Sequence, residues 1–233
     1  MQLTQIHTLS ARLTLISGLH IGAGDSEMHI GGTDNPVLKH PISNRPYLPG
    51  SSLKGKMRSL LEWKSGAVQP EPLGWREYQA AQGAQKVAVF NILRLFGVSG
   101  GEQLDEAQAR ELGPTRLAFW DCDLSDDWVK RVDDANQMFT EVKSENRINR
   151  ITGVAEHPRN TERVPAGAVF NFRLSLKVLD GETDLLPTVL AGLKLIELDS
   201  LGGSGSRGYG KVRFVDLKLD GEPVLLPEDP FRS

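Results

Sequence analysis

The sequence contains almost no cysteine, no long apolar run and no excess of positive charge. Cys122 is the single cysteine in 233 residues, which excludes an internal disulfide, and one Cys with five scattered His gives no basis for a structural zinc site. No stretch of about 18 apolar residues is present to span a membrane. Residues 1–8 show neither a basic leader nor an apolar signal region. We therefore expect a cytoplasmic protein with no membrane partner.

Common catalytic patterns are missing as well. There is no HExxH motif and no Ser/His/Asp or Cys/His set at a usable spacing. The glycine-rich stretch 202–210 lacks the Gly-Lys-Ser/Thr ending of a Walker loop, and we expect a helix before it and a strand after it. A phosphate-binding loop of that class has the opposite order, so the pattern argues against a nucleotide-binding enzyme.

Charge is distributed unevenly, although the formal net charge is only −3. Residues 39–64 carry six Lys or Arg and a single acid, whereas acids gather in residues 102–111 and 121–134. Separated charge of this kind allows one face to bind a polyanion while the whole chain stays slightly acidic. The plainer interpretation is a solvated surface. Charge alone does not distinguish a polyanion-binding face from such a surface, so the motifs must be considered.

Hydrophobic periodicity predicts a mixed α+β chain. Strands are expected at residues 7–20, 116–122, 169–179 and 211–219. Helices are expected from Ser51 or Ser52 onward and at residues 85–96, 126–138 and 183–199. The Gly- and Pro-rich residues 22–50 are typical of an ordered loop, and the polar residues 139–163 of a protruding arm or hairpin.

The order of these elements predicts the fold. With insertions removed it is strand, helix, strand, strand, helix, strand, which is the ferredoxin-like βαββαβ arrangement shared with RNA-recognition domains. We expect a single domain over residues 1–233, with a helical insertion at residues 64–114 and a second insertion at residues 139–163. Such a sheet has an open face with room for RNA.

Two segments and one histidine are candidates for RNA contact. The glycine-rich stretch offers backbone N–H groups to phosphates, with Gly203, Gly205, Gly208, Arg207 and Lys211 as its binding residues. A loop leads into a basic helix start, where Ser51, Ser52, Lys54, Lys56 and Arg58 would face an anion. Gly55 inside that helix suggests the close approach of another backbone. His20 is either a structural residue or an RNA contact.

Asp34 lies in the motif Gly31-Gly32-Thr33-Asp34-Asn35-Pro36. The turn before proline can hold this carboxylate outward, where it could bind a divalent metal or position a ribose and the scissile phosphate. An aspartate in a glycine- and proline-rich loop is also an ordinary turn residue. Residue type alone does not decide between the two.

Taken together, the segments resemble the RAMP superfamily of CRISPR proteins, and within it the third subunit of the type III-A Csm effector complex. The resemblance runs from about residue 8 to residue 219. It is carried by residues 18–22, 31–37, 47–58, 145–155, 162–167 and 202–210.

The resemblance implies a function and partners. Copies of such a subunit stack along a guide crRNA beside other Csm subunits, and a thumb-like hairpin, here residues 139–163 with Arg147 and Arg150, intrudes into the guide–target duplex. The family's loop aspartate maps onto Asp34, which implies target-RNA cleavage with a divalent metal, Mg²⁺ or Mn²⁺. His20 maps onto a guide-contacting histidine. Asn149 replaces the aspartate that relatives often carry, so we assign position 149 no metal role.

Two other functions stay open at this point. A non-catalytic RNA-binding scaffold would lack the loop aspartate, and an endonuclease that processes precursor CRISPR RNA would usually show tandem ferredoxin-like units and a histidine-based site. Further acids at a cut site cannot be ranked from the sequence; the candidates are Asp121, Asp123, Glu141 and Glu145.

Overall fold

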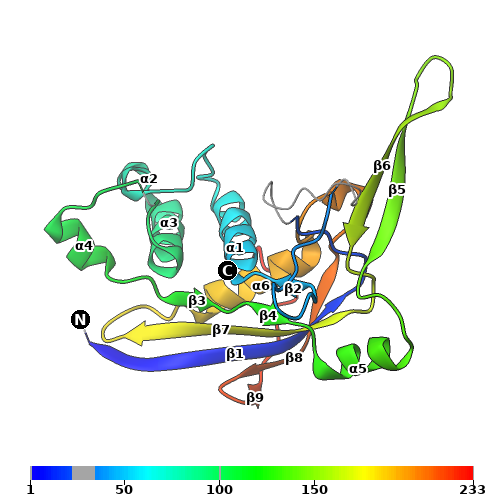
Figure 1. Ribbon diagram of the computed structural model, residues 1–233. Helices are drawn as coiled ribbons and strands as arrows, with labels where there is room; N and C mark the ends of the chain where they lie inside the picture. The colour runs from blue at the N-terminus through cyan, green and yellow to red at the C-terminus, as the bar shows by residue number, and fades with distance from the viewer. Residues whose placement is uncertain (1, 23–34, 100, 233) are drawn as a thin grey trace.

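The computed structural model describes residues 2–22, 35–99 and 101–232. A five-stranded antiparallel sheet forms its base, in the order β3-β7-β1-β8-β9, and helices α1 and α6 lie over one face (Figure 1). This is the predicted ferredoxin-like palm. Its elements are β1 (Leu3–Leu15), α1 (Gly50–Ser65), β3 (Leu117–Phe119), β7 (Val169–Leu179), α6 (Leu186–Leu198), β8 (Val212–Leu219) and β9 (Glu222–Pro223).

The predicted alternation places the core between the sheet and these helices. On β1, Leu9, Leu13 and Leu15 are buried, while Arg12 between them is turned to the other face and partly exposed. β7 buries Phe170, Phe172, Leu174 and Leu176 in the same way. On α1 the apolar stripe of Leu53, Met57 and Leu61 packs against α6 and the sheet, because residues spaced three and four apart share one side of a helix.

Three short helices extend the palm on the side of β3 (Figure 1). They are α2 (Trp75–Ala80), α3 (Gly83–Phe96) and α4 (Glu106–Leu112). The predicted helix at residues 85–96 is therefore confirmed. Its apolar residues Val89, Ile92, Leu93 and Phe96 are buried with the core. None of the helices in the described ranges is long and apolar enough to cross a membrane.

Residues 141–163 form a two-stranded antiparallel hairpin that projects from one end of the palm (Figure 1). Its strands are β5 (Glu141–Ile148) and β6 (Ala155–Arg163). Their register shifts between Glu145 and Arg147, where His157 on the opposite strand takes a φ of 51° and inserts one extra residue. Nearby lie the pair β2 (Tyr47–Leu48) and β4 (Cys122–Asp123), and α5 (Asp126–Asp134).

Two details of α1 correct the sequence expectations. The helix begins at Gly50 with Pro49 as N-cap, so Ser51 and Ser52 lie in its first turn and neither caps it. A side chain at Gly50 would meet the main-chain oxygen of Phe119 at 2.7 Å, so the lack of one allows the helix start to touch β3.

The expectation that another backbone approaches Gly55 is wrong. A Cβ at Gly55 would have no neighbour within 4 Å, whereas a Cβ at Gly192 of α6 would lie 2.5 Å from Cε of Met57. The tight contact between the two helices therefore depends on Gly192.

Candidate nucleic-acid interface

The glycine loop, residues 202–210, connects α6 to β8 at the end of the palm from which the hairpin rises. Four of its residues have positive φ, including Ser204 at 62°, so the chain doubles back sharply. Three of its glycines are needed for packing, because a Cβ would collide with Leu19 and His20 at Gly202, with Ser200 at Gly205 and with Leu201 at Gly210. Gly203 and Gly208 are exposed, but their N–H groups already donate to the main-chain oxygens of His20 and Gly205, each at 3.0 Å, so these N–H groups are not free in this chain for the predicted phosphate contacts.

His20 lies against this loop. The N–H of Gly203 donates to the main-chain oxygen of His20 at 3.0 Å. On the other side, Nδ1 of His20 donates to the main-chain oxygen of Glu162 at 2.7 Å. Because a carbonyl oxygen only accepts, Nδ1 carries a proton. The structure thus gives His20 a structural bond and also places it beside the predicted phosphate-binding loop.

Lys56 of α1 also lies near the glycine loop. Its Nζ lies 2.6 Å from Oδ2 of Asp199, the C-cap residue of α6, which precedes the glycine loop by three positions. Lys54 is partly exposed and has no ion pair within the described ranges. The first helical N–H group, that of Gly50, donates to Oδ1 of Asp121 at 2.7 Å, so a carboxylate of the chain itself already binds the helix start.

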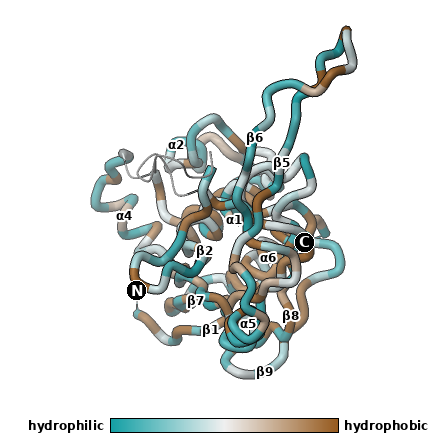
Figure 2. Tube along the Cα trace, turned by 45° about the vertical axis from the view of Figure 1, so that its right-hand side comes forward, coloured by the Kyte–Doolittle hydropathy of each residue, from teal (hydrophilic) through white to brown (hydrophobic). Residues whose placement is uncertain are grey.

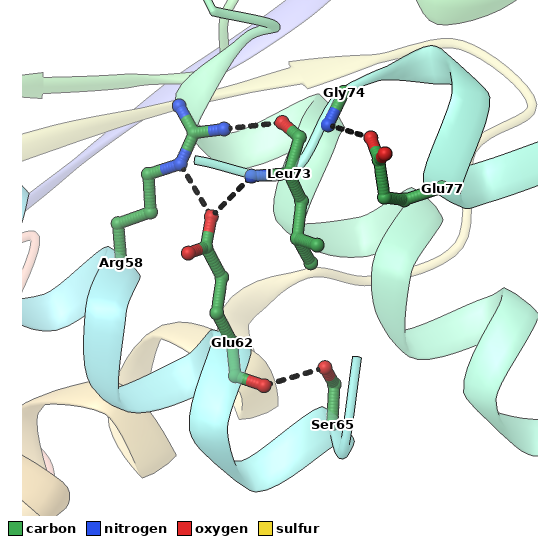
Figure 3. Close-up of polar contacts among 6 residues, drawn as sticks. All are labelled: Arg58, Glu62, Ser65, Leu73, Gly74 and Glu77. Carbon is green, nitrogen blue, oxygen red and sulfur yellow. Dashed lines mark hydrogen bonds and ion pairs between the residues drawn. The ribbon is translucent and has the colours of Figure 1, made fainter. Parts of the chain in front are cut away.

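Arg58 does not lie with the glycine loop, His20 and Lys56. Its side chain is only 12% exposed and turns toward the segment between α1 and α2 (Figure 3). Nε donates to Oε1 of Glu62 at 2.8 Å and Nη2 to the main-chain oxygen of Leu73 at 2.7 Å. The sequence predicted that Arg58 would face an anion at the helix start. Instead, Glu62, one turn later, supplies a buried carboxylate that holds Arg58 inside the protein.

Lys211 also has a structural partner. Its Nζ donates to the main-chain oxygens of Glu197 and Leu198, at 3.3 and 2.6 Å, in the last turn of α6. A cation there satisfies free carbonyl groups and complements the helix dipole. Lys211 is exposed, so this bond does not bury its charge.

Arg207 links the glycine loop to the hairpin. Its Nη1 donates to Oε2 of Glu145 on β5 at 2.7 Å, and its Nη2 to Oγ of Ser204 at 2.7 Å. The buried ring of Tyr209 is in contact with two cations, with Nζ of Lys143 at 4.5 Å and the guanidinium of Arg163 at 5.0 Å from its centroid. The loop and the hairpin base therefore form one continuous surface.

The charges of this junction are set by their neighbours. Burial acts to raise the pKa of Glu145, but Tyr209, Arg207 and Lys143 together lower it below its usual value. Burial and the adjacent Glu145 carboxylate raise the pKa of Tyr209. Glu145 is accordingly ionised and Tyr209 neutral at physiological pH.

Glu162 anchors the second strand of the hairpin, a role that the sequence did not reveal. Oε1 accepts from Nζ of Lys39 and from the hydroxyl of Thr140, both at 2.6 Å, and Oε2 accepts from the N–H of Val37 at 2.8 Å. Its own N–H donates to the main-chain oxygen of Asn35 at 3.1 Å. Burial acts to raise the pKa of Glu162, but these bonds lower it overall. No local motif marks such a residue, because its partners are distant in sequence.

The outer end of the hairpin combines cations with aliphatic side chains. Arg147 and Arg150 are exposed, and neither has an ion pair within the described part of the chain. Ile151 is 97% exposed, Ile148 60% and Val154 59%. Hydrophobic segments are visible at this end of the tube in Figure 2.

Asn149 builds the turn at that end. Its Oδ1 accepts from the N–H groups of Ile151 and Thr152, and its Nδ2 donates to Glu156 at 2.9 Å. An aspartate here would accept the same two bonds but would face the Glu156 carboxylate. The amide therefore has a structural explanation.

Asp34 lies outside the described residues. Within the described ranges, no three or more His, Cys, Asp or Glu side chains are grouped so as to hold a metal ion. Cys122 is buried, and burial raises the pKa of its thiol to about 12, so it is no nucleophile.

The fold suggested that the open face of the sheet has room for RNA, but the side chains on this face are both acidic and basic. It carries a cavity of about 500 Å³ whose walls include Arg12, Arg173 and Lys218 but also Asp121, Asp123 and Asp216. None of the predicted RNA-contacting residues lines it. Acidic and basic side chains are mixed on its walls, which does not favour a polyanion there.

Over most of its length the chain is similar to known proteins. The profile of the RAMP superfamily matches residues 12–213. The chain is 37% identical over 237 aligned positions to the CRISPR system Cms endoribonuclease Csm3 of Methanothermobacter thermautotrophicus, covering 96% of this chain and 89% of the relative. It is 41% identical over 215 positions to that of Streptococcus thermophilus, covering 90% and 87%. A crystal structure of a Csm3–Csm4 subcomplex of the type III-A interference complex superposes with a TM-score of 0.56 at 27% identity, over 94% of this chain and 80% of that one.

Proposed function

Because the chain belongs to the RAMP superfamily and, within it, to the Csm3 family, we propose that it is a guide-RNA-binding backbone subunit of a type III-A CRISPR effector complex. Several copies would stack along one crRNA beside other Csm subunits, and each would cleave the complementary target RNA. A cytoplasmic location suits this role and the lone, buried Cys122.

One observation carries the proposal. Segments far apart in the sequence meet around the glycine loop: His20 contacts Gly203, Lys56 pairs with Asp199, and Arg207 pairs with Glu145 of the hairpin. A histidine and cations gathered at one end of the palm suit a sugar–phosphate backbone held without reading its sequence. Base pairing with the guide would then select the target.

The hairpin is proposed to act on the duplex. Its exposed aliphatic residues resemble in chemistry the apolar side chains that separate stacked bases in other complexes, and Arg147 and Arg150 can contact the flanking phosphates. Displacing a nucleotide would bend the target backbone toward the in-line geometry that strand cleavage requires.

Asp34 is proposed as the catalytic residue, with a divalent ion, Mg²⁺ or Mn²⁺. Its neighbour Asn35 is held by the N–H of Glu162, in contact with the hairpin. Mg²⁺ is usually held by one or two protein carboxylates together with phosphate oxygens, so phosphate oxygens of the RNA would complete the coordination. Chelation with EDTA should stop cleavage by the assembled complex, and added Mg²⁺ or Mn²⁺ should restore it.

RNA binding as a function of salt tests the proposal. The purified chain, alone and with its co-expressed subunits, is titrated against guide-length RNA over a range of NaCl concentrations. The logarithm of the affinity should fall linearly with the logarithm of the salt concentration. Absence of any salt-sensitive affinity in both samples would overturn the proposal.

The alternative processing function has its own test. The isolated chain is incubated with precursor RNA that contains CRISPR repeats. We expect no cleavage, because the described chain forms a single ferredoxin-like unit. Specific cutting within the repeat would favour a processing endonuclease instead.

A further inference from the structure

We propose that Glu145 of the hairpin and a phosphate of the guide compete for the guanidinium of Arg207. In the RNA-free chain this ion pair closes the hairpin base onto the glycine loop, and guide binding opens it. The inference rests on the proposed function and adds to it a restraint on RNA binding by single subunits.

The pair lies where a phosphate can reach it. The Arg207 side chain is 55% exposed, whereas that of Glu145 is 18% exposed, so the guanidinium forms the outer member. Within the described part of the chain, Arg207 uses Nη1 for Glu145 and Nη2 for Ser204. A guanidinium has five N–H donors, and its flat fork suits two oxygens of a phosphate.

Other cations near the loop are less available. Lys56 is 28% exposed and paired with Asp199, and Arg163 is 21% exposed and paired with Glu141. Lys211 is bonded to the last turn of α6. Arg207 is therefore the principal charge that the loop can offer to RNA, and a carboxylate partly neutralises it.

Opening the pair leaves no charge stranded. Glu145 also lies 3.4 Å from Nζ of Lys143, which remains as its partner when Arg207 turns to a phosphate. The hairpin stays attached through Glu162 and through the cations that contact Tyr209. The lowered pKa of Glu145 means that the competing charge is present at neutral pH.

The competition would make the subunit selective for a guide that spans several copies over an unrelated RNA. A single subunit that meets an unrelated RNA has to break the ion pair for few phosphate contacts. A guide that spans several stacked copies provides many contacts at once, and these together outweigh the competition at each copy.

The test measures RNA affinity of the full chain with Glu145→Gln, and with Glu141→Gln as a matched control. Both variants remove one carboxylate from β5, but Glu141 pairs with Arg163 and not with Arg207. Each is also made in an Arg207→Ala background, and Glu145→Ser serves as a second variant. Thermal unfolding confirms that every variant is folded.

We expect Glu145→Gln to bind guide-length RNA about threefold to fivefold more tightly than wild type at moderate salt, in line with an exposed ion pair. Glu141→Gln should change the affinity by less than about twofold, and the gain from Glu145→Gln should disappear in the Arg207→Ala background. Equal gains for both variants, or a gain that survives without Arg207, would overturn this inference alone. A wild-type chain without RNA affinity would overturn the proposed function as well.

Discussion

Arg58 and Glu62 lie one turn apart on α1 and form an ion pair at 2.8 Å, with 12% and 7% of their side chains exposed. Oε1 of Glu62 also accepts from the N–H of Leu73, and Arg58 donates to the main-chain oxygen of the same residue (Figure 3). The pair thus fixes the chain that leads from α1 into α2. A basic residue in a motif associated with RNA is here part of the fold.

Replacing Arg58 should affect stability more than RNA binding. Arg58→Ala leaves the buried Glu62 carboxylate without its cation, which should lower the free energy of unfolding by about 3 kcal/mol. Lys54→Ala, on the same helix, should cost less than about 0.5 kcal/mol. Denaturant unfolding measures both effects.

The same two variants separate structure from RNA contact. Loss of Lys54 should reduce the salt dependence of RNA binding by about one phosphate contact, whereas folded Arg58→Ala should keep the wild-type slope. A stable Arg58→Ala protein with a reduced slope would contradict this account.

Two helical glycines give opposite predictions. Gly55 is exposed with open space around it, so Gly55→Ala should stabilise the protein by about 0.5–1 kcal/mol through helix propensity. Gly192→Ala would place its Cβ 2.8 Å from Cγ of Met57, so it should destabilise by about 1–3 kcal/mol. Thermal unfolding of the two variants should shift in opposite directions, and a shift in the same direction would refute the assigned packing.

The palm was predictable because it depends on local periodicity. Leu9, Leu13 and Leu15 on β1 and the stripe on α1 follow patterns of two and three to four residues, which the fold preserves. Pairings across long separations could not be predicted. Glu162 contacts Val37 and Lys39 more than 120 residues away, and nothing near Glu162 indicates those partners.

The same contrast between local pattern and distant contacts holds for the candidate site residues. The composition of the glycine loop and the motif around His20 predict RNA contacts; the structure brings the two together, and their contact with RNA stays a prediction. Whether a cation faces RNA or the protein depends on which carboxylate lies beside it in space. Glu62 turns Arg58 inward, and Asp199 brings Lys56 to the glycine loop.

Glu162 should make stability depend on acid. Its pKa in the folded chain is below the ordinary value of 4.5, so its contribution is present above that pH and is lost as the pH falls through the folded pKa. Glu162→Gln should therefore lose about 2 kcal/mol near pH 7, and its deficit relative to wild type should shrink below about pH 4. Urea unfolding at a series of pH values measures this. A deficit that stays constant down to pH 3 would show that the Glu162 charge is not responsible.

The outer hairpin should contribute to duplex binding without supporting the fold. Arg147 and Arg150 are exposed, so replacing both with Ala should change the free energy of unfolding by less than about 0.5 kcal/mol. Binding of guide–target duplex should lose about two phosphate contacts from its salt slope. Unchanged duplex affinity and slope would exclude this end of the hairpin from the interface.

Target cleavage by a reconstituted complex that carries Asp34→Ala tests the central claim most directly. Guide content, subunit composition and cleavage of a complementary RNA are measured beside the wild-type complex in Mg²⁺ or Mn²⁺. The account predicts that wild type cuts the target at regular intervals and that Asp34→Ala retains guide and assembly but cuts at least about a hundredfold more slowly. An assembled Asp34→Ala complex that cuts at the wild-type rate would contradict it.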